Sequence, residues 1–327
     1  MNIRYSAAVR RDDWLHVLKN ADLANIFHSP EYFDIQQSLG HELLYSCCYI
    51  DDEPVAVIVA TLNRFGYYQD WVEVGTKSGG CPVMIDKYDQ HPEADTLKNA
   101  MIEAFARQHL KGRRFLFYPC FHLRACILEA PEWNCVTQFD DTAFLDLHAD
   151  EDELFRGMGV KCRNAVRYAS RHAVTARVAN TREYFELFYA CYKAVREKKQ
   201  TQYISRDELR AKFDAFTQQG LADLWVAFRE GQPLAYAFIW KYKQTINFVY
   251  GSSHENGWRY KPNNLIQWEL IRSYKQEGYR VYNMWGIRNM NLSAGKDASV
   301  QTNIEGYGKF KLSFGPELRS LRRYVRV

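Results

Sequence analysis

The amino-acid sequence predicts an α+β fold built from two copies of one domain, each of roughly 150 residues. Two observations indicate the duplication. In each half, a helix-like segment leads into an apolar run, a short polar turn and a second apolar run, first over 33–62 and again over 213–242. Later in each half, a helix-like segment ends at a glycine and leads into a strand-like run, over 97–118 and over 265–284.

The paired apolar runs are typical of β-hairpins, because turn residues separate two stretches of strand length. The turns are 51–54, which contains Pro54, and 229–233, which contains Gly231 and Pro233. We therefore expect strands over 43–50 and 55–62 in the first half, and over 224–228 and 234–242 in the second.

The helix–glycine–strand units are predicted from the glycine that follows each helical run, because glycine readily adopts the left-handed conformation that ends many helices. The expected units are helix 97–110, Gly112 and strand 115–118, then helix 265–274, Gly278 and strand 279–284. Between the two copies, alternation over 141–147 predicts a strand that enters the second domain.

Composition limits the class of protein. The chain has 327 residues, of which 47% are hydrophobic and 15% aromatic, enough for two compact cores. No apolar run approaches the roughly 20 residues that span a bilayer, so we expect a cytoplasmic protein without integral membrane association. The eight cysteines form no C-x-x-C pair, and we expect buried free thiols. A metal is not expected, since no usual zinc module has the spacing of Cys120, His122, Cys126 and Cys135.

A net charge of +4 is too mild by itself to indicate a nucleic-acid-binding protein, and no DNA partner is expected, but the basic residues concentrate in the second half. A helix is expected to begin at 150–153 with acidic residues and then to turn basic. Its spacing places four arginines along one face, with Lys161 nearby: Arg156, Arg163, Arg167 and Arg171. These side chains either bind phosphate or form a solvated face, and the sequence leaves both interpretations open.

Further candidates accompany this helix. Lys199 adds positive charge, and Tyr203 and Tyr250 belong to a set of second-half aromatics of which most are core and a few could line a pocket. The run 306–315 alternates aromatic with polar residues, which predicts a strand with Lys309 and Lys311 on the same face. That pair is either solvated or positioned for an anion.

Standard catalytic motifs are mostly missing. The sequence lacks the nucleophile elbow, the Walker loop, the zinc-protease helix and the dinucleotide-binding glycine motif. The nearest approach to an acyl-CoA pyrophosphate loop is 156–161, which carries a lysine where a small residue belongs and is expected inside a helix.

Five segments in order resemble the Fem family, the aminoacyltransferases that build peptidoglycan interpeptide bridges within the acetyltransferase superfamily. The segments are 142–147, 161–169, 250–253, 261–265 and the pair Phe310-Lys311, with 28–32 similar to the family's opening helix. The resemblance covers almost the whole chain. It implies two tandem GNAT-like domains, each a mixed, mostly antiparallel sheet flanked by helices. Residues 1–140, completed by 316–327, would form the first, and 141–315 the second, with most of the active site.

The resemblance also implies an activity, the transfer of an aminoacyl group from aminoacyl-tRNA to an acceptor amine with formation of an amide. No cofactor is expected, and charged tRNA and a small amine or peptide are the expected partners. Lys311 matches the lysine that family members use near the transferred group. The expected substrate-binding residues are Phe310, Lys309, Tyr250, Arg163, Arg167, Lys161, Lys199 and Tyr203.

The sequence departs from the family at one informative place. Peptidoglycan-type members often carry a lysine in the opening helix that contacts the acceptor's diphosphate, and here that region reads Ile35-Gln36-Gln37. The acceptor therefore stays open between a peptidoglycan precursor, a peptide and a natural-product intermediate. Two other functions also stay open, an acyl-CoA-dependent N-acyltransferase, which would use acyl-CoA, and a noncatalytic RNA-binding protein.

Overall fold

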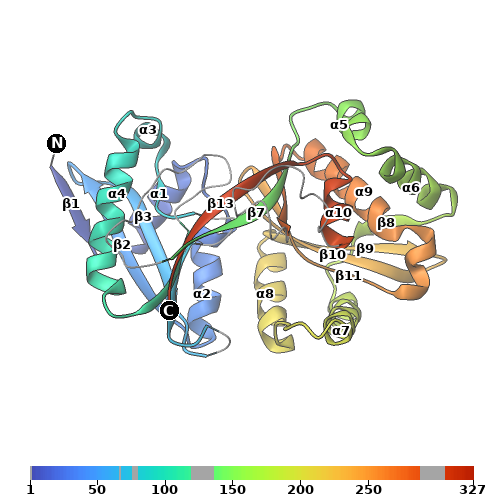
Figure 1. Ribbon diagram of the computed structural model, residues 1–327, viewed down its shortest axis with the longest axis horizontal. Helices are drawn as coiled ribbons and strands as arrows, with labels where there is room; N and C mark the ends of the chain where they lie inside the picture. Colours follow the sequence, from blue (N-terminus) through green and yellow to red (C-terminus); the bar gives the residue numbers. More distant parts are fainter. Residues whose placement is uncertain (1, 66–67, 76–79, 119–135, 288–305) are drawn as a thin grey trace. The chain divides into compact units, whose positions relative to one another are not determined.

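The computed structural model describes residues 2–65, 68–75, 80–118, 136–287 and 306–327 (Figure 1). The described chain divides into two compact units. Unit 1 comprises residues up to 142 and 319–327, and unit 2 comprises 143–287 and 306–318. Each unit is a mixed sheet flanked by helices, which confirms the α+β prediction.

Unit 1 is built on a sheet of strand order β1-β2-β3-β4-β6-β13, with β5 added to β3. Neighbours are antiparallel except β4 and β6, which are parallel. The elements are β1 Ile3–Ser6, α1 Arg11–Lys19, η1 Ile26–His28, α2 Pro30–Ser38, β2 Glu42–Ile50, β3 Glu53–Leu62, β4 Trp71–Val74, β5 Val83–Met84, α3 Asp86–Asp89, α4 Ala94–Phe105, the π-helical η2 Ala106–Leu110, β6 Arg114–Phe117 and β13 Glu317–Arg326.

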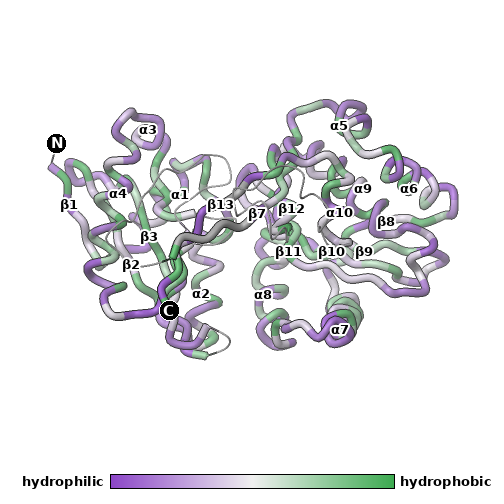
Figure 2. Tube along the Cα trace, in the orientation of Figure 1, coloured by the Kyte–Doolittle hydropathy of each residue, from purple (hydrophilic) through white to green (hydrophobic). Residues whose placement is uncertain are grey.

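Local sequence explains why α2 begins where it does. Ser29 accepts a hydrogen bond from the backbone N–H of Tyr32 at 3.2 Å, and Pro30 occupies the first turn. A serine cap followed by proline at the first helical position is a strong helix-start signal. The expected opening helix is therefore confirmed. Figure 2 shows β3 as a mostly hydrophobic strand, and residues 55–60 along it are all buried.

Unit 2 is built on a sheet of strand order β7-β12-β11-β10-β9-β8, in which β11 and β12 are parallel. Figure 1 shows α6 and α9 on one face of this sheet and α7 and α8 on the other. The elements are β7 Val136–Asp146, α5 Glu151–Gly157, α6 Val160–Arg171, β8 Thr175–Val178, α7 Arg182–Lys198, α8 Arg206–Gln218, β9 Ala222–Arg229, β10 Gln232–Tyr242, β11 Thr245–Ser253, η3 Glu255–Tyr260, α9 Pro262–Gln276, β12 Val281–Ile287 and α10 Gly306–Leu312.

The repeated pattern of the sequence is confirmed element by element. The two predicted hairpins are β2–β3 and β9–β10, and both are antiparallel. The two helix–glycine–strand units are α4 to β6 and α9 to β12. Gly112 and Gly278 have φ angles of 70° and 91°, as the left-handed helix stop requires.

One predicted helix is wrong. The acidic start and the basic continuation form two helices, α5 and α6, because the chain turns at Met158 and Gly159. Asp150 caps α5, since its side chain accepts from the backbone N–H of Glu153 at 2.7 Å. Arg156 consequently lies on a different helix from the other three arginines.

A buried charged network crosses the centre of unit 2. Asp223 on β9 accepts from Lys241 Nζ at 2.6 Å, from the Tyr274 hydroxyl at 2.7 Å and from Asn180 Nδ2 at 2.9 Å. Trp225 Nε1 donates to the Tyr274 hydroxyl at 3.0 Å. Burial, followed by the Asp223 charge, raises the pKa of Tyr274, so its phenol stays protonated and keeps donating.

The cysteine expectation can be checked for part of the set. Five cysteines are buried free thiols, at positions 47, 48, 81, 162 and 191. The segment with Cys120, His122, Cys126 and Cys135 lies outside the described residues. Among the helices that the structure describes, none combines the length and apolar character needed to cross a bilayer.

Candidate active site

The candidate site in unit 2 lies where two parallel strands stop pairing. β11 and β12 are in register at Thr245–Val281, Ile246–Tyr282 and Asn247–Asn283, and the described ladder ends there. On the other side of β11, Phe248 faces Ile239 and Tyr250 faces Phe238, which leaves Val249 as an extra, bulged residue. A β-bulge bends its strand, so β11 changes direction just beyond the last pair with β12.

Two asparagines hold the point of separation. Asn283 Nδ2 donates to Asn247 Oδ1 at 3.0 Å, and Asn283 Oδ1 accepts from the backbone N–H of Trp285 at 2.9 Å. Trp285 has a φ of 70°, a conformation that costs a bulky residue about 1–2 kcal/mol. The asparagine therefore helps to hold a bend that a strand would not otherwise adopt.

One glycine on β11 is required by a close approach. A Cβ on Gly251 would lie 2.5 Å from the Phe248 ring, well inside van der Waals contact. The Phe248 ring consequently lies over the backbone just beyond the bulge, and any larger residue at position 251 would displace it.

Lys311 reaches this bend from α10. Its Nζ donates to the backbone oxygen of Gly286 at 2.9 Å, directly after Trp285, and lies 5.6 Å from the centre of the Tyr307 ring. The residue is only 8% exposed. A charged ammonium is therefore placed at the separating end of β12.

The strand predicted over 306–315 is wrong, because residues 306–312 form helix α10. Side chains two positions apart point to nearly opposite sides of a helix, so Lys309 is exposed while Lys311 is buried. The signal that could have identified the helix is the spacing of Tyr307, Phe310 and Phe314, which is three and then four. Phe310 and Phe314 stack edge to face at 5.3 Å and pack on the unit 2 core.

The end of α10 packs directly on the turn between α5 and α6. The Gly159 N–H donates to Ser313 O at 2.8 Å, and a Cβ on Gly315 would lie 2.5 Å from Gly157 O. The sequence predicts that the segment 156–161, which is similar to an acyl-CoA pyrophosphate loop, lies inside a helix. It lies instead at the junction between α5 and α6. The backbone N–H of Gly159 already donates its hydrogen bond to Ser313 O and is therefore not available to a phosphate oxygen.

The α6 residues lie next to this junction but differ in what they contact. Arg163 Nη1 donates to Arg156 O at 2.7 Å and also to Met158 O, so it holds the carbonyl groups that end α5. The Arg167 guanidinium lies 5.1 Å from the centre of the Phe155 ring. Lys161 is exposed. Arg163 therefore has a structural contact that the sequence did not predict.

The other predicted substrate-binding residues lie on the α7 side of the sheet. Tyr250 packs against Tyr192 on α7 at 5.6 Å between ring centres, and burial raises its pKa. The Tyr203 hydroxyl donates to Glu197 at 3.1 Å, and Lys199 is the exposed C-cap of α7. Lys199 and Tyr203 are thus not brought together with Lys311 and α6.

Residues that sequence reasoning missed are Asn247, Asn283 and Trp285. The available signal was a polar asparagine inside each of two apolar strand runs, because a buried polar side chain needs a specific partner. Among the described residues, no group of three or more His, Cys, Asp or Glu side chains could hold a metal ion.

Comparison with known proteins identifies the fold. Residues 160–291 match the family model of the Acetyltransferase (GNAT) domain. A comparison with curated proteins gave no match.

Solved structures match over nearly the whole chain. FemX is 13% identical with a TM-score of 0.72, covering 98% of this chain and 96% of its own. L-PGS from Bacillus licheniformis is 14% identical with a TM-score of 0.56, covering 97% and 92%. A tandem GNAT protein from the clavulanic acid biosynthesis pathway is 11% identical with a TM-score of 0.54, covering 99% and 98%. The fold is that of tandem GNAT proteins, and the resemblance to the Fem family is confirmed as a likeness of fold.

Proposed function

We propose that the chain is an aminoacyltransferase that moves an aminoacyl group from aminoacyl-tRNA to an acceptor amine. The observation that carries the proposal is the buried Lys311 ammonium at the separating ends of β11 and β12. The likeness of fold to FemX and L-PGS supports it. The acyl group, already activated as an ester, needs positioning and charge stabilisation more than covalent catalysis.

The proposed reaction needs no cofactor, because the amine and the ester supply every atom of the products. A neutral acceptor amine attacks the ester carbonyl and forms a tetrahedral intermediate with a negative oxygen. Lys311 stabilises that oxygen through its positive charge and by hydrogen bonding from its ammonium group. The intermediate collapses to the amide, the ribose oxygen of the tRNA leaves, and the proton lost by the amine goes to that oxygen.

The exposed face of α6 supports an anionic macromolecule as donor. The helix carries four cations and no carboxylate, at Lys161, Arg163, Arg167 and Arg171. None of the four makes an ion pair with a described residue. On α7 and α8, by contrast, most cations have carboxylate partners, namely Lys193, Lys198, Arg206, Arg210 and Lys212, and only Arg182 and Arg196 lack an ion pair with a described residue. Unpaired cations on one helix repel each other unless an anion lies across them.

A donor assay tests the function. The full-length protein is incubated with either charged tRNA or acetyl-CoA and a panel of amines and blocked peptides, and the loss of each donor is followed. We expect amine-dependent consumption of aminoacyl-tRNA. Consumption of acetyl-CoA alone would favour an acyl-CoA-dependent N-acyltransferase, the alternative that the GNAT family match supports. Binding of tRNA without turnover of either donor would favour a noncatalytic RNA-binding protein.

Neutralising the α6 cations should weaken tRNA binding. For the double variant Lys161→Ala/Arg167→Ala we expect about tenfold weaker binding near 0.1 M salt. The slope of log affinity against log salt should become shallower by between one and two, since each lost phosphate contact removes about 0.7–0.9. Filter binding over a salt series measures both quantities.

The matched control is Lys193→Ala/Arg206→Ala, which removes the same charge from α7 and α8, where both cations are paired. Binding by the control should stay close to that of the unmodified protein. Equal weakening by both double variants would show that net charge alone matters and would contradict a specific role for α6.

A further inference from the structure

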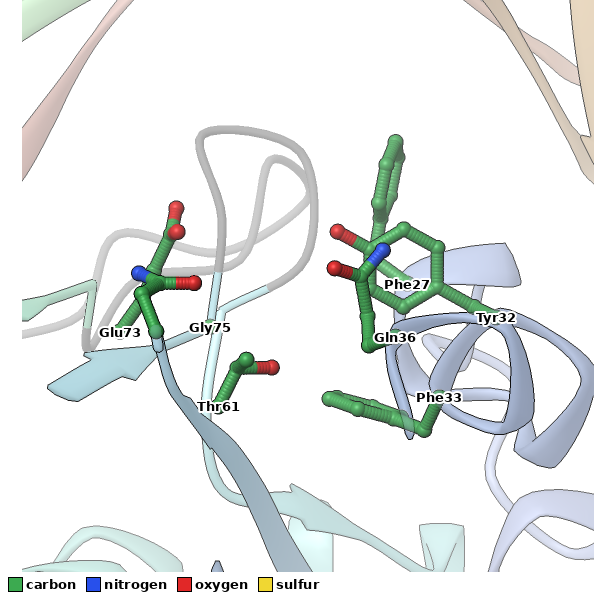
Figure 3. A pocket seen from close by; sticks show the side chains of 8 residues that line it. Phe27, Tyr32, Phe33, Gln36, Thr61, Glu73 and Gly75 are labelled. Atoms are coloured by element: carbon green, nitrogen blue, oxygen red, sulfur yellow. The ribbon is translucent and has the colours of Figure 1, made fainter. Parts of the chain in front are cut away.

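Unit 1 contains a pocket between α2 and the strands β3 and β4, with Gln36 on one wall and Thr61 on the other (Figure 3). Its interior has room for about one water molecule, which is too little for an aminoacyl group or a peptide. The described contacts that bear on the proposed reaction are therefore those of Lys311 and of the helix that carries it, in unit 2.

The carboxyl end of α10 meets the turn between α5 and α6 backbone to backbone. The Gly159 N–H donates to Ser313 O at 2.8 Å. Two residues further on, a Cβ on Gly315 would lie 2.5 Å from Gly157 O. Both atoms of this second contact belong to the main chain, so neither could rotate away as a flexible side chain does. We call the contact formed by these four residues the glycine joint.

Gly315 is restricted in two ways, whereas many helix-ending glycines are restricted in one. Its φ of 77° is left-handed, and its N–H donates to Leu312 O at 3.1 Å, as expected for a glycine that ends a helix. Gly278 does the same for α9 with a φ of 91°, but a Cβ on Gly278 would meet nothing within 4 Å. A side chain at Gly315 would therefore separate α10 from the α5–α6 turn, and a side chain at Gly278 would not.

Arg163 holds the other side of the glycine joint. A helix leaves its last carbonyl groups without partners inside the helix, and α5 ends at Gly157. Arg163 Nη1 donates to the two carbonyl groups that flank Gly157, those of Arg156 and Met158. A positive charge is also favourable at the carboxyl end of a helix. The Gly157 carbonyl that faces Gly315 is thus held between two carbonyl groups bound by one arginine.

The position of Lys311 depends on this support, because Lys311 lies in the last turn of α10. Its carbonyl oxygen accepts from the Phe314 N–H at 3.1 Å, directly before Gly315. Its Nζ reaches Gly286 O at 2.9 Å. A shift of the carboxyl end of α10 would therefore move the ammonium group, and a misplacement of about 1 Å at a reacting centre can cost about 10²-fold in rate.

We propose that Arg163 and the glycine joint position the Lys311 ammonium for acyl transfer. The proposal rests on the proposed function, because that function makes Lys311 the catalytic group. Arg163 and Gly315 are positioning residues, since both act through α10 and neither needs to touch the substrate. The glycine joint also connects α6, whose exposed cations bind tRNA in the proposed function, with the helix that carries Lys311.

Competitive labelling of lysine amines measures the placement of Lys311 without any turnover. The full-length protein is methylated to a low extent with formaldehyde and a borohydride, and peptide mass spectrometry compares Lys311 with the exposed Lys309 as internal reference. In the unmodified protein Lys311 should react more slowly, since it is buried and hydrogen-bonded. Gly315→Ala and Arg163→Lys should each raise the relative labelling of Lys311 about fivefold, because local opening exposes the amine.

The same two variants should transfer the acyl group about 10- to 100-fold more slowly in single-turnover kinetics with charged tRNA. Their affinity for tRNA in filter binding should stay within about twofold, because Gly315 is uncharged and Arg163→Lys keeps the positive charge while losing the rigid guanidinium. A phosphate-binding role for Arg163 predicts the opposite pattern, a change in affinity with Lys311 undisturbed.

Gly278→Ala is the matched control for Gly315→Ala, because it introduces the same left-handed strain at a helix end with open space around it. Both substitutions should lower the urea midpoint. For Arg163→Lys the control is Arg182→Lys, at an exposed arginine that begins α7. Both controls should leave the labelling of Lys311 and the rate of transfer unchanged.

Two outcomes would overturn the proposal. One is a folded Gly315→Ala protein in which Lys311 is labelled no faster than in Gly278→Ala. The other is an Arg163→Lys protein that binds tRNA more weakly with Lys311 labelling unchanged. If urea unfolding shows that Gly315→Ala does not fold, Arg163→Lys decides the question. If labelling rises in both variants while the unmodified protein consumes no donor, the placement of Lys311 by the glycine joint stands and the proposed function fails.

Discussion

Replacing Lys311 by methionine is expected to lower the rate of acyl transfer by roughly 10²–10³-fold, the range for loss of one group that stabilises a developing oxyanion. Methionine has a similar length and suits a buried site, so α10 should keep its packing through Phe310 and Phe314. The loss should appear in turnover more than in the affinity for tRNA, because Lys311 acts on charge that develops during the reaction. Single-turnover kinetics with charged tRNA measures it.

The control is Lys309→Met, which removes an equal charge from the exposed side of the same helix. Its rate should remain within a few-fold of the unmodified protein. A folded Lys311→Met protein with an unchanged rate would remove Lys311 from the mechanism, whatever the donor proves to be. Loss of the helix in the variant would be visible as a lower urea midpoint and would require Lys311→Gln as a second variant.

Replacing Asp223 by alanine is expected to destabilise unit 2 by about 3–5 kcal/mol, the range for breaking a buried ion pair from one side. The substitution leaves the Lys241 ammonium and the Tyr274 hydroxyl without their shared acceptor, and both are largely buried. Each of those groups then carries its full desolvation cost. Urea unfolding followed by tryptophan fluorescence measures the change, and Trp225, hydrogen-bonded to Tyr274, lies within the network.

An exposed carboxylate gives the matched control. Asp214 accepts from Arg210 Nε at 2.7 Å on the surface of α8, and an exposed ion pair contributes at most about 1 kcal/mol. Asp214→Ala should therefore lower the unfolding free energy by no more than that. Equal effects of the two substitutions would mean that the Asp223 network is replaced by water or by repacking.

Much of the fold could be predicted because its signals are local. The two hairpins are predicted by apolar runs on either side of a turn that contains Pro54 or Gly231. The ends of the two helices are predicted by Gly112 and Gly278. These residues act within a few positions of themselves, so a single sequence is enough to locate them. The break between α5 and α6 also had a local signal, two glycines at 157 and 159, which the charge pattern concealed.

Helix α10 shows where local signals mislead. Two glycines in its first three positions disfavour a helix, and the isolated segment of seven residues would be too short to be stable in water. It is helical because Phe310 and Phe314 are buried in the unit 2 core, which is a tertiary effect. The spacing of Tyr307, Phe310 and Phe314 is that of a buried helix face, but the alternation of aromatic and polar residues predicted a strand.

The candidate site could be predicted only in part. Resemblance to the Fem family selected Lys311, but the residues around it come from segments that the fold brings together. Lys311 and Gly286 are separated by 25 positions, and their contact depends on where β12 bends at Trp285. Neither the bulge in β11 nor the end of the β11–β12 ladder has a signature in composition or spacing.

The strand order of unit 1 has a consequence for how the protein is made. β13 pairs with β6 through Tyr324–Phe117 and its neighbours, and Arg326 donates to Leu110 O across 216 positions of chain. While the ribosome synthesises the intervening residues, β6 has an unpaired outer edge that offers its backbone to other chains. Such long-range pairing closes slowly, and the open edge is a site for aggregation during that time. Expression at low temperature or with chaperones should therefore improve the yield of correctly folded protein more than any change within unit 2.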